Sequence, residues 1–241
     1  SPGGQVQILT RSGTNDFHGT FFEYFRNDAL DAKDWFVNAN RLTKPALRQN
    51  DFGFVVGGPV LLPRFGEGGP LAGYNGRNKT FFFVSYEGLR LRQPQTENRV
   101  ILATRIRQSA PTTLQPVLNA LPLPTGAEIG TTGQAPYAAS FSNPSTLNAT
   151  SFRVDHKFGN SATIFGRYDF APSETITRSL STLSTLALTT HTLTLGLTHV
   201  LSARANNEVR FNFSQVQGQS LSNLDGFNGA VPFEKSLLVP S

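Results

Sequence analysis

The sequence predicts an all-β fold, an antiparallel sheet that runs up and down, and three observations lead to this class. Apolar and polar residues alternate along many segments, as in half-exposed strands, whereas helical periodicity is scarce. Phe occurs 20 times in 241 residues, and aromatic residues favour strands. Gly 22 and Pro 15 supply the many turns that such a sheet needs.

Four strands are expected in the first half of the chain: Gln5 to Thr10, Phe17 to Arg26, Gln49 to Leu62 and Lys79 to Arg92. The polar segment 28–48 contains one helix candidate, Ala29 to Asn38, and the Gly/Pro-rich segment 63–78 is expected to be a loop. The stretch 94–148 is rich in Pro, Thr and Ala, and a short helix around Thr113 to Ala120 is its one expected element.

Four more strands are expected in the second half: Ser151 to Phe158, Ala162 to Phe170, Thr190 to Ser202 and Glu208 to Val216. The sequence Gly159-Asn160-Ser161 predicts a tight hairpin turn, and Ala203 to Asn206 turns the chain again. The Ser/Thr-rich segment 173–189 is expected to be a loop.

The connections alternate between long and short from Phe17 onward. The long ones are 28–48, 94–148, 173–189 and 221 onward, and the short ones are 159–161 and 203–206, with 63–78 as a longer member of the short set. In an up-and-down sheet alternate connections lie at the same end, so all long loops are expected at one end. Transmembrane β-barrels show this asymmetry, whereas a soluble sandwich has no need of it. The pattern favours a partial transmembrane β-barrel, and a secreted β-sandwich adhesin or carbohydrate-binding module is the alternative.

Composition excludes several other classes. The longest apolar stretch, Phe52 to Leu62, is too short for a membrane helix. The net charge is +5, but the basic residues are scattered, so no nucleic-acid partner is expected. Cys is 0, which excludes a disulfide framework, a thiolate zinc site and a Cys nucleophile.

No enzyme, cofactor or metal site is expected. The four histidines lack paired metal spacing, and no Ser lies in a G-x-S-x-G context. Asp28, Asp31 and Asp34 offer oxygen ligands for Ca²⁺, but helix capping by Asp28 explains them more simply. Asp155 and Asp169 are expected to face each other across a hairpin within an ion-pair ladder, and a glycosidase dyad is the less favoured interpretation.

A barrel of this kind turns apolar side chains toward lipid and polar ones toward the lumen. Strand alternation then predicts a set of lumen-facing polar residues: Arg153, Asp155, Lys157, Arg167, Asp169, Glu208, Arg210 and Asn212.

One segment resembles a known family junction. The run Gly3-Gly4-Gln5-Val6-Gln7-Ile8-Leu9-Thr10-Arg11-Ser12-Gly13-Thr14-Asn15, followed by Phe17-His18-Gly19, resembles the plug-to-barrel junction of TonB-dependent outer-membrane transporters. Gly3, Gly4, Ser12, Gly13, Thr14 and Asn15 are its junction residues. Further matches follow in the order of the family: Phe21-Phe22-Glu23-Tyr24-Phe25-Arg26-Asn27-Asp28, Arg48-Gln49-Asn50-Asp51-Phe52-Gly53, Gly57-Gly58-Pro59, Asn78-Lys79-Thr80-Phe81-Phe82-Phe83 and Tyr86-Glu87-Gly88-Leu89-Arg90. The combination is similar to the Oar-like branch, and it covers residues 3–92 densely.

The resemblance implies a bacterial outer-membrane protein that imports a siderophore, carbohydrate or peptide with energy from the TonB system. Residues 1–15 would be the C-terminal end of the plug domain and residues 16–241 the N-terminal part of the barrel. It also implies that the chain is a fragment, with about seven strands of a plugged barrel of about 22 strands. The expected partners are outer-membrane lipid and, through parts absent from this chain, TonB.

Overall fold

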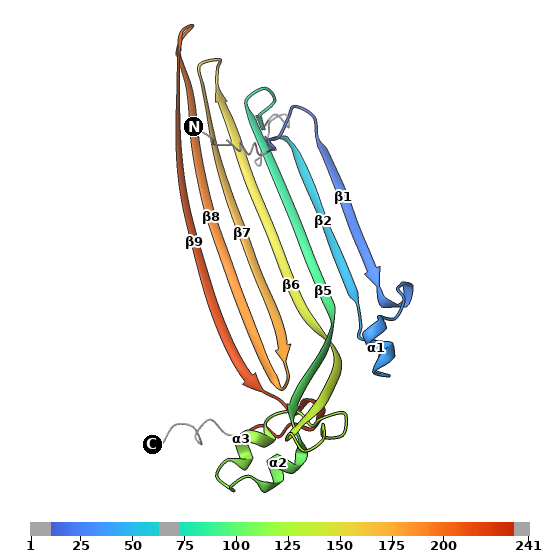
Figure 1. Ribbon diagram of the computed structural model, residues 1–241. Coiled ribbons are helices and arrows are strands. Elements are labelled where there is room, and N and C mark those ends of the chain that lie inside the picture. The colour runs from blue at the N-terminus through green and yellow to red at the C-terminus, as the bar shows by residue number, and fades with distance from the viewer. Residues whose placement is uncertain (1–10, 63–72, 234–241) are drawn as a thin grey trace, which may run out of the picture.

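A single antiparallel sheet of seven strands makes up most of the molecule (Figure 1), and its order is β1-β2-β5-β6-β7-β8-β9. The computed structural model describes residues 11–62 and 73–233. The strands are β1 (His18–Asn27), β2 (Arg48–Pro59), β5 (Thr80–Leu102), β6 (Gln134–Phe158), β7 (Ala162–Ser179), β8 (Thr182–Ser202) and β9 (Ala205–Leu224). The all-β, up-and-down prediction is confirmed. The expected strand at Gln5 to Thr10 lies outside the described residues.

All seven strands lie in one layer, so the sandwich alternative, which needs two packed sheets, is wrong. The two short strands β3 (Leu61–Leu62) and β4 (Tyr74–Asn75) pair only with each other, at the end of β2. Within the described residues β1 and β9 are not paired, so the sheet has two edges and does not close.

Five of the strands are longer than the sequence predicted. β5 has 23 residues, β6 has 25, β7 has 18, β8 has 21 and β9 has 20. About 9–11 residues suffice for a tilted strand to cross a bilayer. The strands therefore extend well beyond the thickness of a membrane.

The prediction of a loop at 173–189 is wrong. β7 and β8 pair as far as Ser179 and Thr182, and only Leu180 and Ser181 turn the chain, with Leu180 at φ 55°. The Ser/Thr content suggested a loop, but Thr is β-branched and fits a pleated sheet. The strict alternation of long and short connections therefore fails at this hairpin.

The loop expected at 94–148 is also much shorter. β5 and β6 stay paired out to Leu102 and Gln134, so only residues 103–133 leave the sheet. This segment and the connection 28–47 still lie at one end of the sheet, and the turns 159–161 and 203–204 lie at the other (Figure 1). The turn at 159–161 is as expected, and the second turn is shorter than expected, since Ala205 and Asn206 already belong to β9. We call these the long-connection end and the short-turn end.

The helices are short and lie at the long-connection end (Figure 1): α1 (Trp35–Ala39), α2 (Thr104–Ser109) and α3 (Gln115–Asn119). α3 falls inside its predicted helix, α1 overlaps the end of the predicted helix Ala29 to Asn38, and α2 was not predicted. Asp34 caps α1, since its Oδ1 accepts from the backbone N–H of Phe36 at 2.8 Å. Capping by Asp28 is therefore wrong, because Asp28 itself lies in the 3₁₀ turn Asp28–Leu30, which Asn27 caps.

The main hydrophobic cluster also lies at the long-connection end. Ile101, Tyr137 and Ala139 are buried there, and Phe141, Leu180 and Phe227 pack against them. We call residues 103–133 and 225–233 the cap. The cap includes the 3₁₀ turn Phe227–Gly229, and it closes over the ends of β5 and β6.

Candidate functional site: the two faces of the sheet

The pairing register divides the sheet into a polar and an apolar face. Arg153 on β6 lies opposite Arg167 on β7. Arg167 lies opposite Thr194 on β8, which lies opposite Asn212 on β9. Directly opposed residues share a face, and side chains two apart along a strand do so as well. We call this side the polar face, and the register brings all eight of the predicted lumen-facing residues to it.

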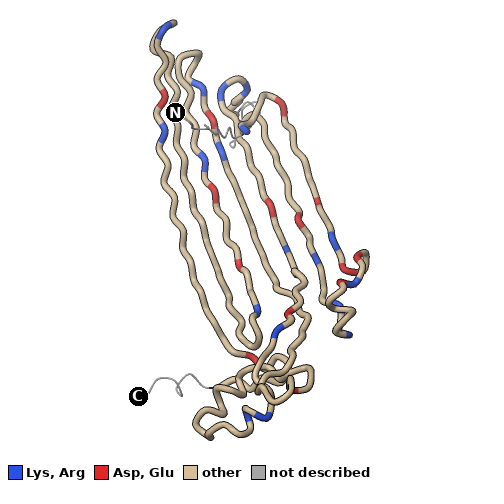
Figure 2. Tube along the Cα trace, in the orientation of Figure 1, with Lys and Arg blue, Asp and Glu red and all other residues tan. Residues whose placement is uncertain are grey.

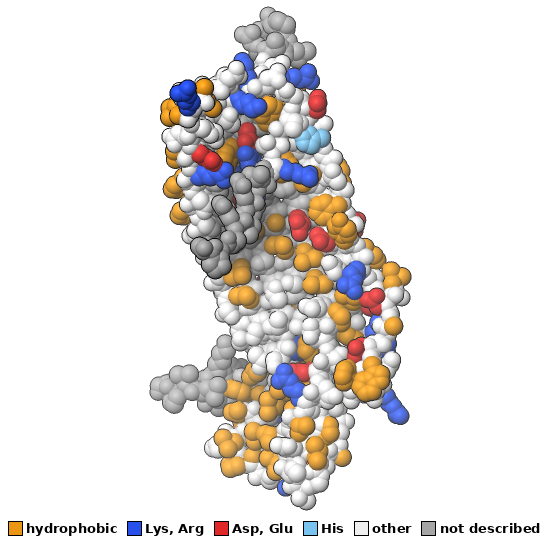
Figure 3. Space-filling view, turned by 45° about the horizontal axis from the view of Figure 1, so that its top comes forward, with side chains coloured by type: hydrophobic (Ala, Val, Ile, Leu, Met, Phe, Trp, Pro, Cys, Tyr) orange, Lys and Arg blue, Asp and Glu red, His pale blue; other side chains and the backbone are white. Residues whose placement is uncertain are grey.

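The opposite side, the apolar face, carries large hydrophobic side chains that lie in the open. Its exposed members include Phe21, Phe25, Phe152, Ile164, Leu195, Leu197, Val209, Phe211 and Phe213. Phe21 is 81% exposed and Phe211 55%. Figure 3 shows hydrophobic side chains exposed along the sides of the sheet and over the cap. A continuous apolar surface of this kind indicates contact with lipid or protein rather than with water.

The apolar residues form a band next to the short-turn end. On β8 the apolar face holds Leu197, Leu195 and Leu193, but β9 beyond Phe213 continues as Gln215, Gln217 and Gln219. β8 contains no charged residue, and β9 contains none between Arg210 and its end at Leu224 (Figure 2). The band is longest on β7, where it runs from Ala162 to Phe170, close to the length of a membrane-crossing strand.

Aromatic rings with polar tips mark the limit of this band toward the long-connection end. The Tyr86 hydroxyl donates to Asn148 Oδ1 at 2.8 Å. The Tyr168 hydroxyl lies 2.7 Å from Nδ1 of His191, and the Phe170 ring packs against the same imidazole, tilted by 39°, at 5.0 Å between centroids. Rings in this position are typical of the aromatic girdle at a membrane interface.

Three arginines on the polar face each pair with a carboxylate of their own strand. Arg153 binds Asp155 through Nε–Oδ2 at 2.9 Å and Nη2–Oδ1 at 2.6 Å. Arg167 binds Asp169 with Nη2–Oδ1 at 2.7 Å, and its Nε lies 3.0 Å from Ser151 Oγ. Glu208 and Arg210 form a third pair on β9, hydrogen-bonded from Nε to Oε1.

The expected ladder across the hairpin is therefore wrong. Asp155 lies opposite Phe165, and Asp169 lies opposite Ser151, so the two carboxylates do not face each other. Each is instead held by the arginine two residues before it on its own strand. The arrangement gives no support to a glycosidase dyad.

Phe165 supports the most buried of these pairs. The guanidinium carbon of Arg153 lies 4.2 Å from the centroid of the Phe165 ring. Gly196 lies opposite Phe165 on β8 and makes space for its ring, because a Cβ at Gly196 would lie 2.1 Å from the ring. Asp155 is only 7% exposed. Lys157, next along this face, lies over Phe81 with Nζ 5.4 Å from the ring centroid.

A hollow of about 290 Å³ opens on the polar face beside the Arg167–Asp169 pair. Small side chains form much of its floor: Ser85, Ala149, Ser151 and Ala171. Phe22 and Glu87 also line it. It is a recess of mixed polar and apolar lining that includes one ion pair.

The junction segment before β1 is fixed to the turn before β5. Asn15 Oδ1 accepts from the backbone N–H of Asn78 at 2.6 Å, and Asn15 Nδ2 donates to Asn78 Oδ1 at 2.5 Å. Gly13 is buried, and a Cβ there would lie 2.3 Å from the carbonyl oxygen of Phe82. Thr14 Oγ1 donates to the carbonyl oxygen of Asp16 at 3.2 Å, whereas Ser12 makes no such bond within the described residues. Gly3 and Gly4 lie outside the described residues.

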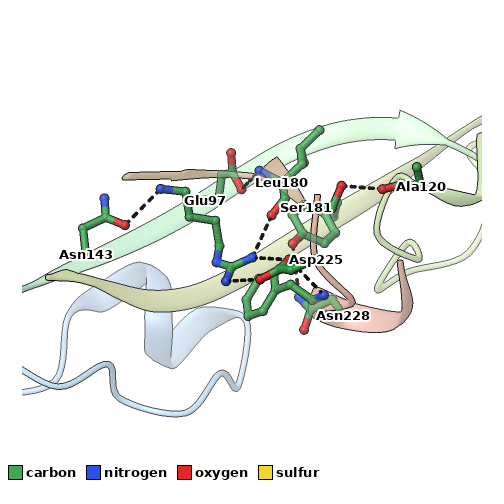
Figure 4. A network of polar contacts seen from close by, with 10 residues as sticks. Glu97, Ala120, Asn143, Leu180, Ser181, Asp225 and Asn228 are labelled. Carbon is green, nitrogen blue, oxygen red and sulfur yellow. Dashed lines mark hydrogen bonds and ion pairs between the residues drawn. The ribbon is translucent and has the colours of Figure 1, made fainter. Parts of the chain in front are cut away.

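An ion pair that the sequence did not reveal fastens the cap. Arg178 donates from Nη1 and Nη2 to Asp225 at 2.7 and 2.6 Å, and it stacks on Phe227 at 4.1 Å (Figure 4). The hydrogen bonds from Arg178 hold the pKa of Asp225 below its ordinary value. The two residues are 47 positions apart, so no local pattern signals their contact.

Further bonds join the β7–β8 turn and the cap to each other and to β5 and β6 (Figure 4). The Leu180 N–H donates to Glu97 Oε2 at 3.3 Å, and the Ser181 hydroxyl donates to the carbonyl oxygen of Ala120. Asn228 Nδ2 donates to the Tyr137 hydroxyl at 3.1 Å. The cap is therefore an ordered unit packed on the strand ends.

Two arginines organise the 103–133 part of the cap. Arg107 is buried, which lowers its pKa, and it donates to the carbonyl oxygens of Leu121 and Pro122 at 2.7 and 2.6 Å. Arg105 pairs with Glu128 at 2.7 Å. This hydrogen bond, followed by one from the Gly133 N–H, lowers the pKa of Glu128.

Within residues 11–62 and 73–233, no three His, Asp or Glu side chains lie close enough together to hold a metal ion. The four histidines lie apart, and His156 accepts or donates a bond with Thr80 Oγ1 at 2.6 Å. In the same part of the chain, no helix has the length and apolar character to cross a membrane.

Comparison with known proteins gives one match. A family model described as an outer membrane beta barrel domain matches residues 9–110 and 97–235. Curated proteins and solved structures gave no match. The single antiparallel sheet, the apolar band and the aromatic girdle agree with this family. The chain belongs to the outer membrane β-barrel family and is a protein of the bacterial outer membrane.

Proposed function

We propose that the chain is part of a TonB-dependent transporter of the Oar-like branch. In this proposal residues 1–15 end a plug domain and residues 16–241 open the barrel. The activity is import of a ligand across the outer membrane, a siderophore, carbohydrate or peptide, without enzymatic chemistry. The TonB system supplies the energy by acting on the plug.

The observation that carries the proposal is the path of the chain into β1. The segment Ser12 to Asn15 reaches the sheet at the short-turn end, where Asn15 and Asn78 bind each other. Short turns face the periplasm in outer-membrane barrels. A plug that fills the barrel from the periplasmic side has to connect to the first strand at that end, and the Asn15–Asn78 clamp fixes such a connection.

The polar face supports the same proposal. Its eight polar residues would line the lumen, where a plug or a ligand meets them. The paired charges Arg153–Asp155 and Arg167–Asp169 leave it polar without a large net field. The hollow beside Arg167 offers a place for a side chain of a plug to dock.

The test is uptake by cells that express the full-length protein. The probes are a labelled ferric siderophore, a maltooligosaccharide and a short peptide, each supplied with and without functional TonB. We expect accumulation of one probe class only when TonB functions, and surface binding in both cases. Accumulation that is independent of TonB would indicate a passive channel and overturn the proposal.

A junction variant ties the uptake to this chain. Asn15→Ala removes the clamp on Asn78 and is expected to lower TonB-dependent uptake while the barrel still assembles. Asn160→Ala is the matched control, because Asn160 lies in the β6–β7 turn at the same end and its side chain makes no hydrogen bond within the described residues. Equal uptake by both variants would show that the clamp has no role in transport.

A further inference from the structure

Three arginines lie together on the apolar face, at the edge of the apolar band. Arg48 on β2 lies directly opposite Arg92 on β5, and Arg90 lies two residues closer to the band. All three are exposed. Like charges directly opposed across a sheet are destabilising. We call these residues the boundary arginines.

Their lack of carboxylate partners sets them apart. Within the described residues, six other arginines lie in strands, and each has an acidic partner within 4.0 Å: Arg26, Arg99, Arg153, Arg167, Arg178 and Arg210. No carboxylate pairs with Arg48, Arg90 or Arg92 in the same part of the chain. Within the described strands, the arginines without a carboxylate partner are therefore collected at one place.

Arg90 is held in position by the sheet. Its Nη2 donates to Asn148 Oδ1 at 2.8 Å and its Nη1 to the carbonyl oxygen of Leu147 at 3.0 Å. Its guanidinium carbon lies 5.9 Å from the centroid of the Phe52 ring. Asn148 also accepts from Tyr86 of the aromatic girdle, so Arg90 lies at the level of that girdle.

Protein covers the same face just beyond the arginines. The Ser140 and Ser142 hydroxyls on β6 donate to the carbonyl oxygens of Thr43 and Ala46, at 2.5 and 2.6 Å. These serines lie on the apolar face by strand alternation, so the connection 28–47 crosses β5 there. The boundary arginines occupy the strip between this crossing and the apolar band, which is the level of lipid headgroups.

An apolar groove of about 530 Å³ adjoins them toward the band. Phe21, Phe52, Phe54 and Tyr86 line it on the apolar face. Gly88, between Tyr86 and Arg90 on β5, makes room for Phe52, because a Cβ there would lie 2.8 Å from the ring. Glu23 is the one carboxylate in its lining, and Arg90 adjoins the groove through the Phe52 ring.

We propose that Arg48, Arg90 and Arg92 bind the phosphate of an anionic lipid in the outer leaflet, with an acyl chain of that lipid in the adjacent groove. Planar guanidinium groups form paired hydrogen bonds with phosphate oxygens. Basic clusters beside a membrane-spanning segment attract anionic headgroups. The lipid phosphate also offsets the repulsion between Arg48 and Arg92. The site faces lipid, so it is independent of the proposed transport activity.

The test measures lipid binding to the full-length protein in detergent micelles. The probe is diphosphorylated lipid A, and the comparison lipid is the same molecule after removal of its phosphates. The triple variant Arg48→Gln, Arg90→Gln, Arg92→Gln is expected to bind lipid A about a hundredfold more weakly. Wild type is expected to bind the dephosphorylated lipid as weakly as the variant binds lipid A.

The matched control removes three cations from the short-turn end, with Arg77→Gln, Lys79→Gln and Arg204→Gln. It is expected to bind lipid A like wild type. Wild-type affinity in the boundary triple variant, or an equal loss in both triples, would overturn the proposal. The single variant Arg92→Gln removes the repulsion with Arg48 and is expected to fold. If the triple variant does not assemble, weaker binding of lipid A by Arg92→Gln than by wild type tests the site.

Discussion

Arg178 and Asp225 meet through two parallel hydrogen bonds, of 2.7 and 2.6 Å, that fasten the segment after β9 to the end of β7. The Arg178 side chain is 14% exposed and that of Asp225 31%. The Asp225 carboxylate also accepts from the Phe227 N–H at 3.2 Å, which starts the 3₁₀ turn that packs on Tyr137 and Phe141. One ion pair therefore joins the strand ends to the cap.

Asp225→Asn is expected to loosen the cap without unfolding the sheet. The change removes one side of a partly buried charged hydrogen bond, at a cost of about 1–3 kcal/mol to the cap. Hydrogen exchange of the amides in 103–133 should speed up, while that of β8 stays unchanged. Glu208→Gln is the control, because its pair with Arg210 is exposed and far from the cap. Equal exchange in both variants would contradict a fastening role for Arg178–Asp225.

The cap is also expected to loosen at acidic pH. The pKa values of Asp225 and Glu128 are lowered in the folded protein, by hydrogen bonds from Arg178 and Arg105 in first place. A carboxyl with a depressed pKa contributes stability above its ordinary pKa, and this stability is lost as the pH falls through the folded value. Proteolysis of the cap should therefore stay constant near neutrality and rise below about pH 4.

Asp225→Asn should show a smaller rise on acidification, since one of the two titrating groups is gone. Loosening of the wild-type cap between about pH 6 and 7 would instead point to histidine and contradict this assignment.

The two faces of the sheet predict opposite responses to a charge at adjacent positions of β8. Leu195 is 44% exposed on the apolar face, and Thr194 lies on the polar face, where it accepts from Asn212 Nδ2 at 2.8 Å. Leu195→Arg is expected to cost about 2–4 kcal/mol near the membrane midplane. Thr194→Arg loses one exposed hydrogen bond and places a cation opposite Arg167, at a cost of about 0.2–1 kcal/mol, so it should assemble better than Leu195→Arg. The yield of heat-modifiable barrel in outer membranes measures both, and better assembly of Leu195→Arg would reverse the faces.

The polar face could be read from the sequence because strand alternation is local. Arg153, Asp155 and Lys157 share a face whatever their partners, and the hairpin at 159–161 fixes how Arg167 and Asp169 join them. The direction of the ion pairs could not be read, because it depends on the exact register: Asp169 lies opposite Ser151, four residues from Asp155.

Contacts between distant segments lay beyond the sequence. Asn15–Asn78 and Arg178–Asp225 bring together residues 63 and 47 positions apart, and each depends on how whole strands end. The turn at Leu180 was missed for a different reason. A Ser/Thr-rich composition fits a loop, yet Thr177 and Ser184 pair across a regular ladder.

The two ends of the sheet are expected to lie on opposite sides of the outer membrane. The apolar band adjoins the short-turn end, so the polar strand extensions and the cap project from the other side, which in outer-membrane barrels is the cell surface. Gly130 suits an epitope insertion in the cap, because its φ is 56° and a Cβ there would meet nothing within 4 Å. Gly133 suits it less, since its N–H binds Glu128 at 2.8 Å. An epitope at Gly130 should be stained by antibody on intact cells. The same epitope at Asn160, in the β6–β7 turn, should be stained only after the outer membrane is opened. The reverse result would place the cap in the periplasm and invert both the proposed plug connection and the leaflet of the boundary arginines.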